Sequence, residues 1–247
     1  MTTETRSSQD VHSWLEAVTV DPAVAELRPD YRALLITAEG LRPGPSDEFS
    51  ERMLTAAEER VRESGVAEDP GSHPHIAAWH EAFRSFGAKP KRIRPSADAL
   101  LRRVPEGLPR VDRITDIYNA VSVTHAVPIG GENLDTYQGP ARLARADGTE
   151  EFEIMTAGEP TVEHPKAGEV VWRDDAGVTC RRWNWRQCVR TRLTLETTRA
   201  FFLLDALGPM DDAALTAAGD ELTAALAESS PGLVTTTRLL RAVPEQS

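Results

Sequence analysis

Closely spaced turn residues divide the stretch from residue 137 to residue 183 into short apolar and β-branched runs. The turns are Asp-Gly, Gly-Glu-Pro and Asp-Asp-Ala-Gly sequences, and the runs between them are Tyr137–Ala146, Glu151–Met155, Glu169–Arg173 and Val178–Trp183. Runs of this length between such turns are typical of β-strands. The stretch therefore predicts a sheet of short strands, and any fold for this chain must contain that sheet.

Other elements are predicted on both sides of this stretch. Two apolar runs bounded by proline and aspartate predict strands near the N-terminus, at Leu15–Val20 and Arg32–Thr37. Apolar residues at helical spacing predict helices at Ser46–Glu63, Ile76–Phe86, Ser96–Arg103, Arg113–Val123, Leu193–Leu207 and Asp211–Glu228. Pro231–Ser247 is predicted to be a strand or a helix followed by a frayed tail. Helices, strands and helices in blocks predict an α+β fold rather than a regular βαβ alternation.

Length and composition limit the domain organisation. The 247 residues suffice for one generous domain, and the 40% of hydrophobic residues suffice for a buried core. We expect a main domain over residues 1–208 and a helical extension over residues 209–247. No apolar run approaches the roughly 20 residues that span a bilayer, and the first residues, MTTETRSSQD, lack the layout of a signal peptide. The expected location is cytoplasmic, where Cys180 and Cys188 stay reduced.

Charge is distributed unevenly along the chain. The formal net charge of −11 argues against nucleic-acid binding over the whole surface. Residues 84–113, however, contain nine basic residues and three acidic ones. Local fields steer a polyanion more than the total charge does, so this segment is a candidate RNA contact, and no DNA partner is expected. The candidate RNA-binding residues are Lys89, Lys91, Arg92, Arg94, Arg102 and Arg103. A solvated surface that balances nearby acids is the alternative.

The segment Val178–Thr191, VTCRRWNWRQCVRT, contains two of the five tryptophans, both cysteines and four arginines. Indole rings provide flat apolar walls and guanidinium groups fit carboxylates and phosphates, so we interpret the segment as a binding site. Strand alternation places Cys180, Arg182, Asn184 and Arg186 on one face and Arg181, Trp183 and Trp185 on the other. Asn184 and Arg186 are then free to line a cleft. The alternative is a twisted structural strand whose arginines pair with Glu169, Asp174 and Asp175.

Histidines and glycines supply further candidates. His73, His75 and His80 lack the spacing and the carboxylate or cysteine neighbours of a metal site, so no metal is expected. His125 precedes a glycine-rich break and is either a general base or a helix cap. The pair Gly130–Gly131 lets the backbone approach a ligand closely. The sequence contains no phosphate-binding loop, dinucleotide fingerprint or hydrolase elbow, and no cofactor is expected.

Four blocks of the sequence, taken in order, resemble one known family. The blocks are KPKRIRPSADALLRRV, LPRVDRITDIYNAVSVTHAVPIGGENLD, GEVVWRDD and CRRWNWRQCVRT, and together they extend over roughly Trp79–Asp205. They resemble free-standing proteins of the B3/B4 domain family, which is the editing domain of the bacterial phenylalanyl-tRNA synthetase β subunit. The resemblance implies a B3/B4-like α+β domain with mixed β layers flanked by helices and an additional C-terminal helix. It also implies an amino-acid-sized pocket between helices and a β layer.

Individual positions resemble the pocket of this family. In the synthetase, the pocket hydrolyses tyrosine wrongly attached to phenylalanine tRNA. Asn119 matches the asparagine of the segment at the pocket floor, and Asp135 matches the acidic residue that closes the following loop. Glu132 stands where the synthetase has its pocket histidine, and Trp183–Arg186 replaces the glycine-rich turn and the glutamate that reads the tyrosine hydroxyl. These departures predict a changed amino-acid specificity.

The resemblance implies an RNA-linked editing factor that hydrolyses the aminoacyl ester of a mischarged tRNA. Its expected partners are this tRNA and an amino-acid-sized ligand, without a membrane. The candidate catalytic residues are Asn119, His125, Gly130 and Gly131, and the candidate substrate-binding residues are Glu132, Asp135, Asn184, Trp185 and Arg186. Two alternatives stay open: a non-catalytic module that binds tRNA or an amino acid, and a scaffold for a synthetase or ribosomal partner.

Overall fold

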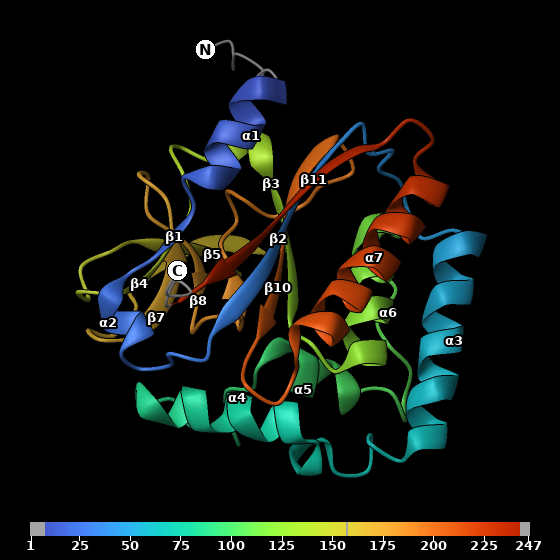
Figure 1. Cartoon of the computed structure of the whole chain (residues 1–247), viewed down its shortest axis with the longest axis horizontal. Helices are drawn as coiled ribbons and strands as arrows, with labels where there is room; N and C mark the ends of the chain where they lie inside the picture. Colours follow the sequence, from blue (N-terminus) through green and yellow to red (C-terminus); the bar gives the residue numbers. More distant parts are fainter. Residues whose placement is uncertain (1–7, 157, 243–247) are drawn as a thin grey trace.

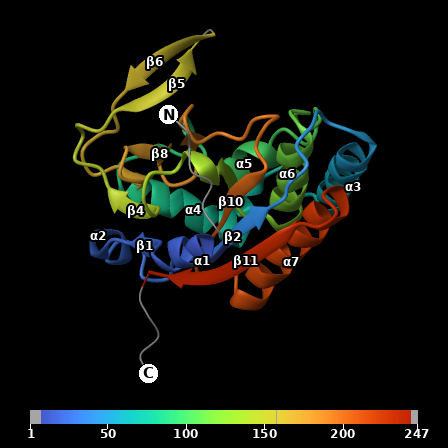
Figure 2. The same cartoon turned by 90° about the horizontal axis from the view of Figure 1, so that it is seen from above.

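Two β-sheets and several helices make up the fold, which the computed structural model describes for residues 8–156 and 158–242 (Figure 1). The first sheet is antiparallel, with the strand order β11 (Val234–Arg241), β2 (Arg32–Glu39), β10 (Arg199–Ala206) and β3 (Ile129–Asn133). The second sheet has the order β1 (Thr19–Val20), β4 (Arg142–Arg145), β7 (Val170–Arg173), β8 (Val178–Arg181) and β9 (Arg186–Gln187). A hairpin of β5 (Phe152–Thr156) and β6 (Glu159–Glu163) extends away from the body of the molecule (Figure 2).

β2 and β10 form the centre of the first sheet. They pair over their whole length, from Arg199 opposite Glu39 to Ala206 opposite Arg32. Nearly every residue of both strands is buried, because the sheet is covered on both faces, and this explains their almost continuous apolar sequences. β11 pairs with the other side of β2, and β3 pairs with the other side of β10. The predicted strand Arg32–Thr37 is confirmed.

Two predicted elements are wrong. The segment Leu193–Leu207, predicted as a helix, contains β10 instead. Periodicity does not distinguish a short buried strand from a buried helix, and in this chain the pairing with β2 and β3 decides the conformation. The predicted strand Leu15–Val20 begins within α1 (Ser8–Glu16), and only its last two residues pair, with β4. Its apolar side chains are those of a helix end that packs on the core.

Helices cover one face of the first sheet. α6 (Arg113–His125) and α7 (Asp212–Ser229) pack on this face, and α3 (Glu48–Ser64) packs against α6 (Figure 1). Asp47, Asp112 and Asp211 cap the three helices by accepting hydrogen bonds from backbone N–H groups in their first turns. The three helices predicted in these places are confirmed, with ends that differ by at most two residues.

The opposite face of the first sheet packs against the second sheet. The core between them includes the side chains of Trp172, Trp183, Phe201 and Leu203. α1 and α4 (Pro74–Ser85) complete this core, and α5 (Ser96–Leu101) follows α4. The short helical turns are α2 (Pro22–Ala25), η1 (Pro70–Ser72) and η2 (Leu134–Thr136). Strands are present in all four predicted runs, and β4, β7 and β8 lie within three of them and pair in the second sheet. β5 ends one residue beyond the run Glu151–Met155 and pairs with β6 in the separate hairpin.

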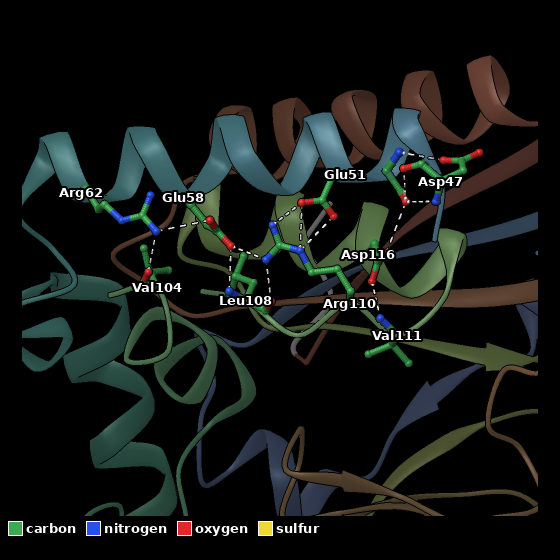
Figure 3. Close-up of polar contacts among 10 residues, drawn as sticks. Asp47, Glu51, Glu58, Arg62, Val104, Leu108, Arg110, Val111 and Asp116 are labelled. Atoms are coloured by element: carbon green, nitrogen blue, oxygen red, sulfur yellow. Dashed lines mark hydrogen bonds and ion pairs between the residues drawn. The ribbon is translucent and has the colours of Figure 1, made fainter. Parts of the chain in front are cut away.

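Polar contacts hold the connection between α5 and α6 against α3 (Figure 3). Glu58 of α3 is 6% exposed, and its Oε1 accepts hydrogen bonds from the backbone N–H of Leu108 and from Arg110, both at 2.7 Å. Arg110 also forms an ion pair with Glu51 at 2.6 Å. These contacts hold the connection between α5 and α6 on α3, and both helices border the site described below.

The C-terminal segment contains α7, which packs on the first sheet, and β11, which is an edge strand of this sheet. The predicted domain boundary at residue 208 falls between β10 and α7. Beyond it, β11 pairs with β2 from Val234 opposite Glu39 to Arg241 opposite Arg32. Of the strand and the helix considered for Pro231–Ser247, the strand is present. Residues 243–247, where the frayed tail is predicted, lie outside the described residues.

Candidate functional site

A cavity of about 260 Å³ lies between the two sheets, where α5 and α6 meet them. The first sheet contributes Gly130, Glu132, Leu203 and Asp205 to its lining. The second sheet and the connection from β8 to β9 contribute Trp172, Cys180, Trp183, Asn184, Trp185 and Arg186. α5, α6 and the residues after α5 contribute Ser96, Leu100, Arg103 and Asn119. Pockets for drug-sized ligands measure roughly 300–1,000 Å³, so this cavity suits a smaller molecule.

The register of the first sheet explains why two acidic side chains reach the cavity. Glu132 lies directly opposite Phe201, and the backbone N–H of Asp205 donates to the carbonyl of Pro128 at 3.0 Å. Alternate residues of a strand share a face, so Asp205 lies on the same face of β10 as Phe201 and Leu203. Both carboxyl groups therefore enter the space between the sheets from neighbouring strands.

Asp205 is only 3% exposed, and its carboxylate has two neutral partners. The hydroxyl of Tyr31 donates to Oδ1 at 2.6 Å, and Nδ2 of Asn184 donates to Oδ2 at 3.2 Å. Burial raises the pKa of Asp205 to about 7, although these two hydrogen bonds act in the opposite direction. An acid that titrates near neutral pH in a cavity is suited to bind a cation or to exchange a proton.

Glu132 is the second buried acid of the cavity, with an exposure of 1%. Its carboxylate accepts a hydrogen bond from the hydroxyl of Tyr137. Burial raises the pKa of Glu132 to about 7, and this hydrogen bond lowers it in part. General bases work best when their pKa lies near the working pH, so Glu132 is suited to take up a proton from a bound water.

Some buried polar atoms of the lining have no hydrogen-bond partner within the described part of the chain. They include Oγ of Ser96, Nε1 of Trp172 and Oδ1 of Asn184. The side chain of Asn119, on α6, is also buried at the lining. Buried polar groups in proteins are nearly always hydrogen-bonded. These atoms therefore mark positions where a ligand or a water molecule completes the pairing.

The connection between β8 and β9 forms one wall of the cavity. Arg182 and Trp183 have left-handed backbone conformations, with φ of 49° and 67°, so the chain turns after Arg181. The predicted alternation of residues 180–186 along a single strand is therefore wrong. The turn buries Trp183 in the core and still brings Asn184 to the lining.

Trp185 contacts two arginines at this wall. The guanidinium carbon of Arg182 is 4.1 Å from the centroid of its ring, and that of Arg186 is 4.5 Å away. Cation–π contacts of this kind hold an arginine over an indole ring. Arg186 is exposed, as is Arg103 at the end of α5, so the rim of the cavity is basic while its interior contains two acids.

Other arginines of the same segment form the ion pairs of the structural alternative. Arg181 donates to both carboxylate oxygens of Glu169, at 2.7 and 3.0 Å, and both side chains are 4% exposed. Arg190 pairs with Asp174 at 2.8 Å. The segment therefore anchors the second sheet through these arginines and leaves Arg186 at the cavity.

Six of the predicted catalytic and substrate-binding residues line the cavity: Asn119, Gly130, Glu132, Asn184, Trp185 and Arg186. The other three lie elsewhere. Nε2 of His125 is 2.7 Å from a carboxylate oxygen of Glu221 on α7. Gly131 lies against Phe202, whose ring would be 2.9 Å from a Cβ at this position. Asp135 forms an ion pair with Arg199 at 2.8 Å.

Asp205 is a lining residue that is not among the candidates predicted from the sequence. Asp205 lies in the segment predicted as a helix, and a helix there does not place its side chain beside Glu132. When residues 200–207, AFFLLDAL, are read as a strand, Asp205 falls on the same face as Phe201 and Leu203. A lone acid in such an apolar run is the signal that could have identified it.

Cys180 also lines the cavity, but it does not have the properties of a nucleophile. Burial raises the pKa of its thiol well above the ordinary value. Since the thiolate is the reactive form, Cys180 acts as an apolar part of the wall. Among residues 8–156 and 158–242, no group of three or more histidine, cysteine, aspartate or glutamate side chains could hold a metal ion.

A second cavity, of about 820 Å³, borders the other side of α5. Five of the predicted RNA-binding residues line it, namely Lys89, Lys91, Arg92, Arg94 and Arg102, whereas Arg103 lines the first cavity. Buried Asp98 pairs with Arg102 at 2.8 Å and with Arg94 at 3.6 Å. Lys89, Lys91 and Arg92 are exposed and form no ion pair within the described residues. These three side chains, which are without an ion-pair partner in the described part of the chain, therefore lie on the other side of α5 from the first cavity.

Residues 78–229 match the family described as the B3/4 domain. This match extends over more than half of the chain, and the chain belongs to the B3/4 domain family. The family and the α+β fold predicted from the sequence are thus confirmed. No curated protein matches the chain.

Among solved structures, the chain is similar to the crystal structure of an N-terminal fragment of the phenylalanyl-tRNA synthetase β-subunit from Pyrococcus horikoshii, with a TM-score of 0.45 and 17% sequence identity. The similarity covers 90% of this chain and 50% of that chain, so this chain spans about half the length of the fragment. In the part of the chain that the structure describes, none of the helices combines the length and the apolar character needed to cross a membrane.

Proposed function

We propose that this chain hydrolyses the aminoacyl ester of a mischarged tRNA. The observation that carries the proposal is the first cavity. It contains two buried acids and polar atoms without a hydrogen-bond partner among the described residues, and exposed arginines lie at its rim. Its volume suits an amino acid, and its basic rim suits the phosphates of an RNA end. Membership of the B3/4 domain family supports the proposal, since the resemblance links that family to editing.

The chemistry requires little from the protein, because an aminoacyl ester is already activated. A positioned water and stabilisation of the charge that develops on the carbonyl oxygen suffice. In the proposal, Glu132 accepts a proton from the water while the water oxygen bonds to the carbonyl carbon. The bond from that carbon to the ribose oxygen then breaks, and the ribose oxygen receives the proton. The amide of Asn119 holds the water or the amino acid.

The Glu132→Gln substitution is expected to slow deacylation by about 10²–10⁴-fold, because it removes the proposed base. Asn119→Ala should also slow it, because it removes the amide that holds the water or the amino acid. Arg186→Ala should mainly raise KM. The measurement is the release of free amino acid from a panel of correctly and wrongly charged tRNAs.

His125→Ala provides the matched control for these variants. His125 pairs with Glu221 away from the first cavity, so this variant should keep the rate of the unchanged chain. A folded protein that leaves every mischarged tRNA intact would rule out the proposed function.

The cations of the second cavity are proposed to bind the RNA backbone. Combined substitution of Lys89, Lys91 and Arg92 by alanine is expected to weaken binding of all tRNAs to a similar extent. The slope of log K against log salt should decrease by about 0.7–0.9 for each phosphate that the protein no longer neutralises. Filter binding over a range of salt concentrations measures this slope. Arg60→Ala, which changes an exposed arginine on α3, should leave it unchanged.

A binding module without chemistry is the second candidate function. It is favoured by Glu132 at the position of the synthetase histidine and by the protonated thiol of Cys180. This candidate predicts that an amino acid stabilises the fold in thermal unfolding by mass action, without any deacylation.

A further inference from the structure

We propose that the amino acid of the substrate has a long side chain ending in a cationic nitrogen group, an ammonium or a guanidinium, and that Asp205 binds this group. The inference rests on the proposed function, because it assumes that the ester lies beside Glu132. It makes Asp205, together with Tyr31 and Asn184, the group of residues that determines which amino acid is accepted.

The first argument is that Asp205 lacks a cationic partner within the described part of the chain. Its hydrogen bonds come from Tyr31 and Asn184, which are both neutral. Three other buried acids each have an arginine, in the pairs Asp98–Arg102, Asp174–Arg190 and Glu169–Arg181. A buried carboxylate without a counter-ion is unfavourable. A cation that enters the cavity therefore gains more at Asp205 than at an acid already paired.

The second argument is the balance of donors and acceptors around Asp205. Each carboxylate oxygen has two lone pairs, and Tyr31 and Asn184 occupy one on each. Oδ1 of Asn184 is buried and has no partner among the described residues. Acceptor positions therefore remain on both residues. An ammonium or a guanidinium supplies several N–H donors to them, whereas a phenol supplies one and an aliphatic side chain supplies none.

The third argument is distance. Phe201 lies opposite Glu132, and Asp205 is four residues further along β10. The backbone positions of Phe201 and Asp205 are therefore roughly 13 Å apart. The side chains of Glu132 and Asp205 cover part of this distance. The α-ammonium of an aminoacyl ester is bonded to the carbon next to the carbonyl, so it stays beside Glu132. The far end of a side chain as long as that of lysine or arginine reaches Asp205.

The walls of the cavity suit the stem of such a side chain. Trp172, Trp183 and Leu203 line the cavity together with the two acids. Long cationic side chains bury their methylene groups along apolar surfaces and keep the charged end at a polar partner. A cation over an indole ring gains a further electrostatic attraction.

The test measures the binding of amino-acid methyl esters by calorimetry. The probes are the methyl esters of L-arginine, L-lysine, L-tyrosine and L-leucine, which share the ester and the α-ammonium and differ in the side chain. The arginine or the lysine ester is expected to bind at least about tenfold more tightly than the other two. Asp205→Asn is expected to remove this preference and to leave the affinity for the leucine ester unchanged.

Asp205→Asn is suited to this test because it keeps the neighbours in place. The new amide oxygen accepts the hydrogen bond from Tyr31, and the amide of Asn184 can rotate so that its unpaired Oδ1 accepts from the new NH₂ group. Asp135→Asn is the matched control, since Asp135 pairs with Arg199 outside the cavity. This variant should keep the preference for the cationic esters.

Equal affinity for all four esters, or a preference that survives Asp205→Asn, would overturn the inference. The charged tRNA panel separates this failure from that of the proposed function. Deacylation limited to aromatic or aliphatic amino acids refutes the role of Asp205 and supports the hydrolysis. Tight binding of the cationic esters without any deacylation refutes the hydrolysis and supports the role of Asp205 in a binding module.

Discussion

The Asp205→Asn variant is expected to be more stable than the unchanged chain above about pH 7, by as much as about 4 kcal/mol in the free energy of unfolding. Burial raises the pKa of Asp205 from 3.8 to about 7, and each pKa unit corresponds to about 1.4 kcal/mol. The amide has no charge to desolvate, and it keeps the hydrogen bond from Tyr31. The variant is more stable because the charged carboxylate of Asp205, a proposed binding group, lowers the free energy of unfolding when it is buried.

The pH dependence of this difference follows from the direction of the pKa shift. An acid with a raised pKa in the folded state binds its proton more tightly there. Its stabilising contribution is therefore complete below about pH 4 and is lost as the pH rises to about 7. Urea denaturation at about pH 4.5, 6 and 8 should show a growing difference between the two proteins. An equal difference at all three values would contradict the assignment.

Arg181→Met is expected to lower the free energy of unfolding by about 3–5 kcal/mol, the range typical of removing one partner from a buried ion pair. The variant leaves the buried carboxylate of Glu169 with a longer contact of 3.4 Å to Arg182. The guanidinium of Arg181 also lies 5.9 Å from the ring centroid of Trp185. Its removal should therefore loosen the wall of the first cavity as well as the second sheet.

The control for Arg181→Met lies in the same sheet. Arg142 of β4 pairs with Asp175 at 2.9 Å, with side-chain exposures of 34% and 58%, and Arg142→Met should change the stability by less than about 1 kcal/mol. Adding Glu169→Gln to Arg181→Met should restore part of the stability, because it removes the unpaired charge. Equal effects of Arg181→Met and Arg142→Met in chemical denaturation would show that burial does not strengthen the pair.

The amphipathic helices could be predicted because each is determined by local signals. α3, α6 and α7 place apolar residues at helical spacing, and each begins at an aspartate that caps its first turn. The residues of the first cavity that belong to the resembling blocks could also be proposed, as with Asn119 and Asn184. Asn119 and Asn184 could be proposed because each lies within one of these sequence blocks.

The remaining features depend on contacts between distant parts of the chain. β10 is a strand because β2, more than 150 residues earlier, and β3 pair with it, and no local pattern reports that pairing. His125 is a candidate base by its neighbours in sequence, but α7 brings Glu221 to it from 96 residues away. The left-handed turn at Arg182 and Trp183 lacks a glycine, so its sequence carries no signal of the conformation.

The position of β2 between β11 and β10 has a consequence for shortened forms of the protein. A fragment limited to the family match, residues 78–229, would lack both β2 and β11. β10, with its eight buried residues, would then have an open edge of unpaired backbone N–H and C=O groups. Such an edge is a template for pairing between copies. β2 and β11 therefore cover this edge of β10, and a fragment without them is expected to associate with further copies.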